Sequence, residues 1–136
     1  MRVVRVDDIT DVFHGELGEE IYELIGQPST IGATSRLSVA YVVIPPGKSS
    51  PAHRHEIAEE IYYVVKGRGT MQVNDKRFTV QAGHAILIAP SEIHQIRNYE
   101  VEGSLEFLAI SGPPWTQADH HPAELPFLDE LAEEQL

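Results

Sequence analysis

The sequence predicts an all-β protein, a sandwich or a barrel, on three observations. Short runs rich in Val, Ile, Tyr, Phe and Leu recur along the 136 residues, and turn-forming Gly, Pro and Asn-Asp signals separate them at short intervals. Hydrophobic residues make up 42% of the chain, which is enough for a packed interior and too many for a disordered chain. The length favours a single domain, residues 1–136, with one core.

Each apolar run is expected to form one strand, and together the runs place a barrel core at about residues 30–112. Residues 70–73 and 77–80 flank Asn74-Asp75 and are expected to form a hairpin. Residues 15–26 precede the main runs and fit either a strand or a short helix, because their periodicity does not decide between the two. The expected strands are residues 38–44, 61–65, 70–73, 77–80, 85–89, 93–98 and 104–110.

The last segment, residues 113–136, differs from the rest because it opens with prolines and then becomes acidic. Phe127, Leu128 and Leu131 fall at helical spacing after Pro126, a residue suited to the first turn of a helix. We therefore expect a short C-terminal helix or a docked tail, with a solvated acidic face.

The charge of the chain excludes two classes of partner. With 21 acidic and 10 basic residues, the formal net charge is −11, whereas nucleic acids and anionic membranes select basic surfaces. The sequence has no cysteine, so thiolate metal ligands and disulfides are excluded. It shows neither a signal peptide nor an apolar stretch long enough to span a membrane, so we expect a cytoplasmic protein.

His53 and His55 lie two residues apart at the entrance to an apolar run. Side chains two apart on a strand project to the same face, roughly 6.5–7 Å apart, so both imidazoles can reach one ion while Arg54 points outward. Glu60 follows five residues later, so a turn or bulge must intervene before a new strand in which Glu60 and Tyr62 share a face. A carboxylate buried beside apolar residues is costly alone, and a metal ion removes that cost.

A second stretch, residues 83–98, repeats this pattern with an apolar strand, a turn at Pro90-Ser91 and then His94. His94 and Asn98 share one face of the expected strand, and Arg97 lies on the opposite face. A single inward-facing histidine is usually a core residue with a hydrogen-bond partner. Here it is a candidate ligand, because the upstream histidines and glutamate need a further one.

These residues resemble the two motifs of the cupin superfamily. The first motif, G(x)5HxH(x)3–4E(x)6G, matches at each fixed position, and its last spacing selects Glu60 over Glu59. In the second motif, G(x)5PxG(x)2H(x)3N, Ala89 replaces the proline and Ser91 replaces the second glycine. The resemblance covers about residues 38–110, and the matching positions are Gly47, His53, His55, Glu60, Gly67, Gly83, His94 and Asn98.

The resemblance implies a small double-stranded β-helix, or jelly-roll barrel, of two antiparallel sheets. It also implies one divalent transition metal ion held by His53, His55, Glu60 and His94. Three imidazoles and one carboxylate suit Fe, Mn, Ni, Co, Cu or Zn, and the ligand types do not choose among these ions. Tyr62 is the candidate catalytic residue, as an acid, a base or a hydrogen-bond donor, and a core tyrosine is the alternative.

Small cupins commonly dimerise by packing sheets and exchanging N-terminal strands. Residues 2–6 alternate as such a strand would, so we expect a homodimer. The remaining candidate polar residues are expected to be structural or superficial. They are His14 in a loop, His84 and Asn98 at turns, Arg36 and Arg97 on the surface, and His120 and His121 in an exposed turn.

Two functions from different classes are consistent with these residues. The first is a metal-dependent enzyme acting on a small oxygenated or carboxylate-bearing molecule, of the dioxygenase, lyase, isomerase or cyclase type. The alternative is a non-catalytic module that binds a metal or a sugar-type small ligand. A barrel without any metal is disfavoured by four candidate ligands in register. The sequence selects neither the substrate nor the reaction.

Overall fold

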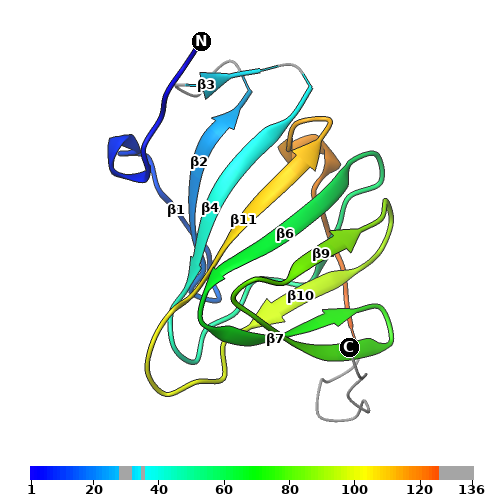
Figure 1. The fold of residues 1–136 in the computed structure, drawn as a ribbon. Coiled ribbons are helices and arrows are strands. Elements are labelled where there is room, and N and C mark those ends of the chain that lie inside the picture. Colours follow the sequence, from blue (N-terminus) through cyan, green and yellow to red (C-terminus); the bar gives the residue numbers. More distant parts are fainter. Residues whose placement is uncertain (28–31, 35, 126–136) are drawn as a thin grey trace.

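The computed structural model describes residues 1–27, 32–34 and 36–125, and these residues form two facing β-sheets (Figure 1). All strand pairs are antiparallel except the short parallel pair of β2 and β3. The two 3-10 turns, η1 at Val6–Asp8 and η2 at Gln117–Asp119, are the helical segments of the described residues. The predicted all-β barrel of two sheets is confirmed.

The larger sheet is built mostly from strands distant in the sequence. Its order is β1-β2-β4-β11-β6-β9, with β3 paired to β2 at one edge. β11, the last long strand in the sequence, lies between β4 and β6 and pairs with both. The bounds are β1 Phe13–His14, β2 Glu20–Gly26, β3 Gly32–Ala33, β4 Ser38–Ile44, β6 Glu59–Lys66, β9 Ala85–Ile88 and β11 Leu105–Gly112.

The smaller sheet has the order β12-β5-β10-β7-β8. The hairpin predicted around Asn74-Asp75 is confirmed, because Val73 pairs with Lys76 across a turn in which Asn74 has a φ of 51°. The bounds are β5 His53–Arg54, β7 Arg68–Val73, β8 Lys76–Gln81, β10 His94–Arg97 and β12 His121–Pro122.

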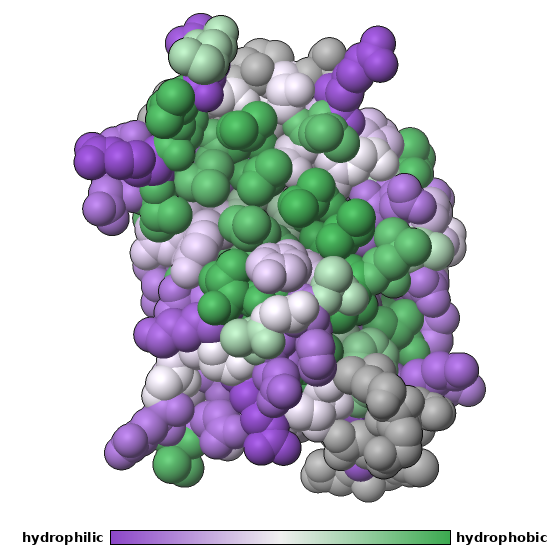
Figure 2. Space-filling model, in the orientation of Figure 1, coloured by the Kyte–Doolittle hydropathy of each residue, from purple (hydrophilic) through white to green (hydrophobic). Residues whose placement is uncertain are grey.

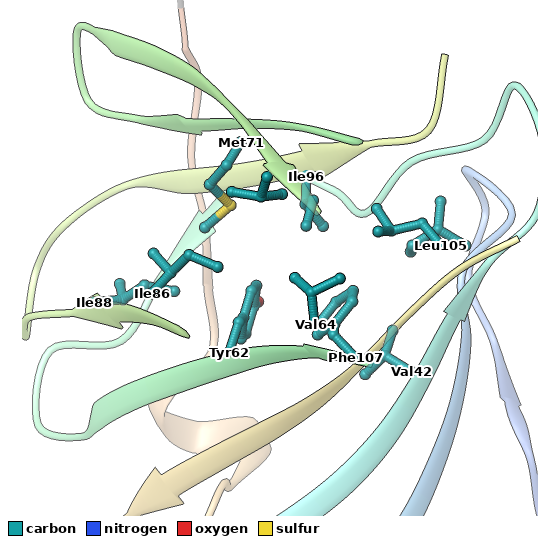
Figure 3. Close-up of a cluster of buried hydrophobic side chains, with 11 residues drawn as sticks. Val42, Tyr62, Val64, Met71, Ile86, Ile88, Ile96, Leu105 and Phe107 are labelled. Atoms are coloured by element: carbon teal, nitrogen blue, oxygen red, sulfur yellow. The ribbon is translucent and has the colours of Figure 1, made fainter. Parts of the chain in front are cut away.

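The hydrophobic core fills the space between the two sheets (Figure 3). Strand β6 alternates as predicted, since Tyr62 and Val64 are buried while Tyr63 and Val65 are exposed. The Tyr62 ring packs on Phe107 with ring centroids 4.5 Å apart. The buried core residues are Val42, Ile44, Tyr62, Val64, Met71, Val80, Ile86, Ile88, Ile96, Leu105 and Phe107.

The structure shows the conformation of three segments for which the sequence predicted either two alternatives or a strand. Residues 20–26 form a strand, which settles the choice between strand and helix. Residues 1–5 form no strand in this chain, and a 3-10 turn follows them at Val6–Asp8, so the strand expected at residues 2–6 is not formed here. Residues 113–125 form a docked tail with η2 and β12, and the helix predicted after Pro126 lies outside the described residues.

Within the described part of the chain, no helix is both long enough and apolar enough to cross a membrane.

Candidate metal centre

Two chain segments bring the four predicted ligands to one end of the barrel. His53 lies in β5 and pairs with His94 of β10, so these two residues are cross-strand neighbours. His55 follows β5, and a short loop then leads into β6, which carries Glu60. All four side chains are buried, while Glu59 is exposed, so the motif spacing chose the inward-facing glutamate correctly.

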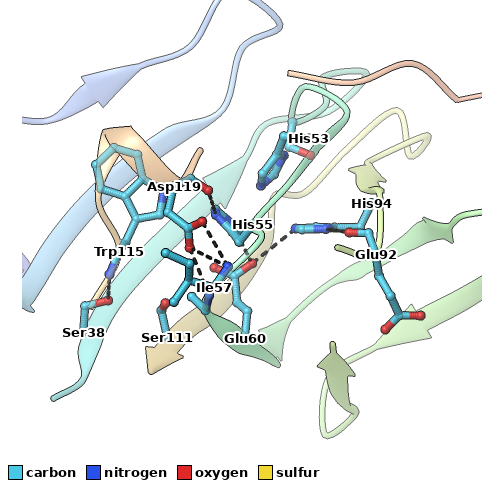
Figure 4. Close-up of polar contacts among 12 residues, drawn as sticks. Ser38, His53, His55, Ile57, Glu60, Glu92, His94, Ser111, Trp115 and Asp119 are labelled. Atoms are coloured by element: carbon cyan, nitrogen blue, oxygen red, sulfur yellow. Dashed lines mark hydrogen bonds and ion pairs between the residues drawn. The ribbon is translucent and has the colours of Figure 1, made fainter. Parts of the chain in front are cut away.

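The ligand atoms of these residues converge. One nitrogen or oxygen from each of His53, His55, Glu60 and His94 lies within 4.8 Å of those of the other three. His94 Nε2 and His55 Nε2 lie 3.2 and 3.6 Å from Glu60 Oε1 (Figure 4). The histidine and glutamate motifs therefore meet in space as the sequence predicts.

The second nitrogen of each imidazole is held by a backbone carbonyl. His53 Nδ1 lies 2.9 Å from the Pro51 oxygen, and His94 Nδ1 lies 3.0 Å from the Glu92 oxygen. His55 Nδ1 lies 3.0 Å from the Asp119 oxygen. A carbonyl only accepts, so each Nδ1 must donate its hydrogen, and in a neutral imidazole the Nε2 lone pair is then free. This is how proteins commonly orient histidines that bind metals.

Three atoms facing the centre of this cluster are buried without a hydrogen bond to any described residue. They are His55 Nε2, Glu60 Oε1 and His94 Nε2. Leaving such groups unpaired in a low-dielectric interior costs free energy, and a divalent ion accepting their lone pairs would remove that cost. The residues present therefore fit a divalent transition metal ion, and the donor set does not identify it.

The electrostatics of the cluster favour the metal-binding forms of two candidate ligands, His53 and Glu60, whereas without an ion His55 is shifted toward its protonated form. Burial and the neighbouring His94 lower the pKa of His53 to about 3, so this imidazole is neutral at physiological pH. Burial alone would raise the pKa of Glu60, but the adjacent His55 and His94 lower it to about 2, so the group is a carboxylate. Burial lowers the pKa of His55, and Glu60 more than reverses this, leaving a net upward shift.

Tyr62 lies directly below the ligands, with its ring 5.8 Å from that of His94. Burial and then the Glu60 carboxylate raise the pKa of Tyr62 well above its ordinary value, so the phenol keeps its proton. In this environment Tyr62 can donate a hydrogen bond but cannot act as a base near neutral pH. Its predicted catalytic role stays a prediction, and of the three roles considered the raised pKa disfavours that of a base while leaving those of an acid and a hydrogen-bond donor.

Most of the remaining polar residues take the structural roles expected of them. Asn98 Nδ2 donates to the Ile44 and Gly103 oxygens, both at 3.0 Å, and so ties β10 to two neighbouring segments. His84 lies beyond the Gly83 turn and its Nδ1 accepts from the Gln81 backbone. His14 is exposed, although it lies in β1 rather than in a loop.

The prediction for the segment around His120 is wrong. We expected an exposed turn, but the tail packs over the candidate ligands and His120 is only partly exposed. The His120 ring stacks on that of His53, with centroids 4.6 Å apart and an interplanar angle of 22°. Asp119 is buried and contacts the loop that follows His55. No periodicity in this short, proline-rich segment marks a buried side, so this packing could not be predicted from the residue pattern.

Ser91, which replaces the second glycine of the second motif, keeps the backbone conformation expected of that glycine. Ser91 adopts a φ of 71°, in the left-handed region that favours glycine, and its backbone nitrogen donates to the His55 oxygen at 2.6 Å. The turn geometry expected of a glycine is thus kept with a serine. The motif glycine Gly67 also has a positive φ, and a Cβ there would collide with the Ser104 carbonyl oxygen.

Comparison with curated proteins finds relatives of both unknown and described function. The chain is 37% identical over 82 residues to an uncharacterised protein of Methanocaldococcus jannaschii, covering 60% of this chain and 65% of the relative. It is 38% identical over 71 residues to an oxalate-binding protein of Thermotoga maritima, covering 52% of this chain and 58% of the relative. The alignments thus span less than two thirds of the length of these two relatives.

Solved structures share the fold over most of the chain. A predicted oxalate decarboxylase from Thermotoga maritima is 30% identical, with a TM-score of 0.69 and coverage of 82% of this chain and 99% of that one. The polyketide cyclase RemF from Streptomyces resistomycificus matches with a TM-score of 0.72 over 93% of this chain and 88% of that one. Its identity of 20% supports the fold alone.

The family match agrees with the motifs and with the geometry of the site. The family model described as "Cupin domain" matches residues 40–111, which include all four candidate ligands and both motifs. The chain therefore belongs to the cupin domain family.

Proposed function

We propose that this cupin is a metal-dependent enzyme that acts on a small oxygenated or carboxylate-bearing molecule. One divalent transition metal ion would be held by His53, His55, Glu60 and His94. The observation that carries the proposal is the convergence of four buried side chains, in which His55 Nε2, His94 Nε2 and Glu60 Oε1 lack a hydrogen bond to any described residue while a backbone carbonyl holds Nδ1 of each histidine.

The charge of such a site favours an anionic ligand. A divalent ion with one carboxylate ligand has a net positive charge, within a chain whose formal net charge is −11. When bound, the ion would polarise a ligand oxygen and lower the pKa of a bound water or hydroxyl. Around it, the chain supplies three oriented imidazoles, the Glu60 carboxylate and the protonated Tyr62 phenol, which we propose as a hydrogen-bond donor to a ligand oxygen.

The relatives support a small carboxylate as the ligand class. One curated relative is named an oxalate-binding protein, and a structure at 30% identity is titled a predicted oxalate decarboxylase. Oxalate is a small dianion with adjacent oxygens, which a positively charged centre can chelate. We therefore propose small mono- and dicarboxylates as the first compounds to test, with dioxygenase, lyase, isomerase and cyclase chemistry all open.

The experiment pairs metal analysis with a substrate screen. Purified wild-type protein is loaded with Fe, Mn, Co, Ni, Cu or Zn, and metal content is measured against the His55→Ala variant. Metal-loaded protein is then incubated with small acids, including oxalate, while oxygen uptake and products are followed. Turnover lost in the variant supports an enzyme. Wild-type protein that binds none of these metals would contradict the proposal.

A second candidate is a non-catalytic module that binds a small ligand at the metal. The name of the oxalate-binding relative favours this reading specifically. Metal-loaded protein that converts none of the acids, yet melts at a higher temperature with oxalate, would support the module over the enzyme.

We also propose that the partner in solution is a second copy of the chain, in the cytoplasm, without nucleic acid or membrane. The outer face of the larger sheet is largely apolar (Figure 2). Strand pairing places Leu87, Ile61, Ile110 and Val39 side by side across this face. Leu87 and Ile61 expose 62% and 37% of their surface, so this row offers apolar area that a second sheet can bury.

A further inference from the structure

The C-terminal tail closes the end of the barrel that holds the candidate ligands. It begins against the larger sheet, where the Trp115 backbone donates to Ser38 Oγ at 2.8 Å. It ends on the smaller sheet, where β12 pairs with β5 beside His53. Asp119 lies between these two anchors and points toward the loop that joins His55 to β6 (Figure 4).

The Asp119 carboxylate holds this loop through its backbone. Oδ1 accepts from the nitrogens of Glu56 at 2.9 Å and Ile57 at 3.1 Å, and Oδ2 accepts from Ala58 at 3.0 Å. These three residues span the connection between His55 and β6. One buried carboxylate therefore sets the path of the chain between two candidate ligands, His55 and Glu60.

The Asp119 backbone oxygen acts on His55 directly. It accepts from His55 Nδ1 at 3.0 Å, across 64 positions of sequence. The carbonyls that orient His53 and His94 come instead from residues two positions earlier, Pro51 and Glu92. Of these three imidazoles, His55 is thus the one whose Nδ1 partner comes from a distant segment.

From these contacts we infer that Asp119 is a positioning residue of the metal centre, so that the tail is a working part of the site. The inference rests on the proposed metal function. Asp119 would contact neither the ion nor a small molecule bound to it, and it acts through His55 and the loop before Glu60. Loss of its carboxylate would let the loop relax and would shift the backbone oxygen that orients His55, while leaving all four candidate ligands in the chain. Losing such a supporting contact typically weakens metal affinity about 10–100-fold.

The test compares Asp119→Asn with a matched variant that loosens the tail elsewhere. Ser38→Ala removes the hydrogen bond to Trp115 but leaves the loop after His55 untouched. Zinc affinity is measured by competition with a chromophoric chelator, and the visible absorption of the cobalt-loaded protein reports ligand geometry. Thermal unfolding with chelator present checks that each variant folds without metal.

The expected result for Asp119→Asn is zinc affinity about 10–100-fold weaker than wild type and an altered cobalt spectrum. Ser38→Ala should match wild type in both. Wild-type zinc affinity and an unchanged cobalt spectrum in Asp119→Asn would overturn the inference. An equal loss of zinc affinity in Ser38→Ala would also overturn it, because any loosening of the tail would then have the same effect as loss of the Asp119 carboxylate. If Asp119→Asn does not fold, Asp119→Glu is measured instead, because its longer side chain displaces the carboxylate and cannot keep all three backbone contacts. Wild-type zinc affinity in Asp119→Glu would then overturn the inference. Failure of the wild type itself to bind zinc or cobalt counts instead against the proposed function.

Discussion

At the scale of single residues, each of the three candidate histidine ligands is oriented by a backbone carbonyl. His53, His55 and His94 follow from two-residue periodicity and motif spacing, which are local properties of the chain. The carbonyls that orient them are backbone groups and leave no mark in the residue types. The one from Asp119 is also distant in sequence, so only the folded tail reveals it.

Ser91 should be a mild strain point, because a serine there holds a φ of 71°. Ser91→Gly is expected to raise the free energy of unfolding by about 0.5–1 kcal/mol, since glycine adopts this conformation without a Cβ clash. Denaturant unfolding measures the change. Ser91→Ala serves as the control, because alanine keeps the Cβ and should bring no gain.

Glu19 should destabilise the protein at neutral pH. Its Oε2 is buried without a hydrogen bond to a described residue, and burial raises its pKa. A carboxyl group whose pKa is raised on folding binds more protons in the folded state. Its destabilising contribution to the free energy of unfolding therefore grows as pH rises above the pKa of the unfolded state. Glu19→Gln is therefore expected to raise the free energy of unfolding at pH 7 by about 1 kcal/mol.

The gain from Glu19→Gln should shrink as pH falls toward the ordinary glutamate range, because the native carboxyl becomes protonated there. Unfolding curves at several pH values measure this dependence. A gain that is constant with pH would show that the charge of Glu19 is not its cause. Glu124, which is exposed in the tail, provides the control substitution Glu124→Gln.

At the scale of elements, alternation predicted β6 and the hairpin of β7 and β8, since one buried face leaves a period of two in the sequence. Residues 2–6 form no strand within a single chain, and their pairing with a second copy stays a prediction. A docked tail was one of the two forms expected of the C-terminal segment, but the place where it docks could not be predicted. Its packing depends on contacts with the loop after His55, which is more than 60 residues away.

Neighbouring valines of β6 should differ sharply in their effect on stability. Val64 is fully buried and Val65 is 38% exposed. Val64→Ala is expected to lower the free energy of unfolding by about 2 kcal/mol, through lost burial of two methyl groups and the cavity left behind. Val65→Ala should change it by less than about 0.5 kcal/mol. Equal effects in denaturant unfolding would contradict the assignment of the inner face.

At the scale of the whole molecule, the fold places the candidate metal centre at one end of the barrel and an apolar sheet face on its outside. The arrangement of β11 between β4 and β6 could not be read from periodicity, which finds strands but not their neighbours. The resemblance to the cupin motifs supplied that topology at once. The apolar sheet face leads to a prediction about self-association, and the candidate metal centre leads to a prediction about metal binding.

The apolar face should drive dimerisation through the row that includes Ile61 and Leu87. Ile61→Lys is expected to shift the protein from dimer to monomer, because a charge at the centre of a sheet-to-sheet contact would be buried without a partner. Sedimentation velocity measures the distribution. Val101→Lys, in an exposed loop, should leave the dimer intact. A wild-type protein that sediments as a monomer would rule out this surface as a self-association site.

The central claim is that one divalent ion is bound by side chains from β5 and the residue after it, from the start of β6 and from β10. Metal content and zinc affinity of the wild type and of His94→Ala test it most directly, since His94 joins the second motif to the first. We predict one ion per wild-type chain and an affinity for His94→Ala reduced at least about 10-fold, with the metal-free variant still folded. Wild-type protein without bound metal after loading, or His94→Ala with unchanged affinity, would contradict the account.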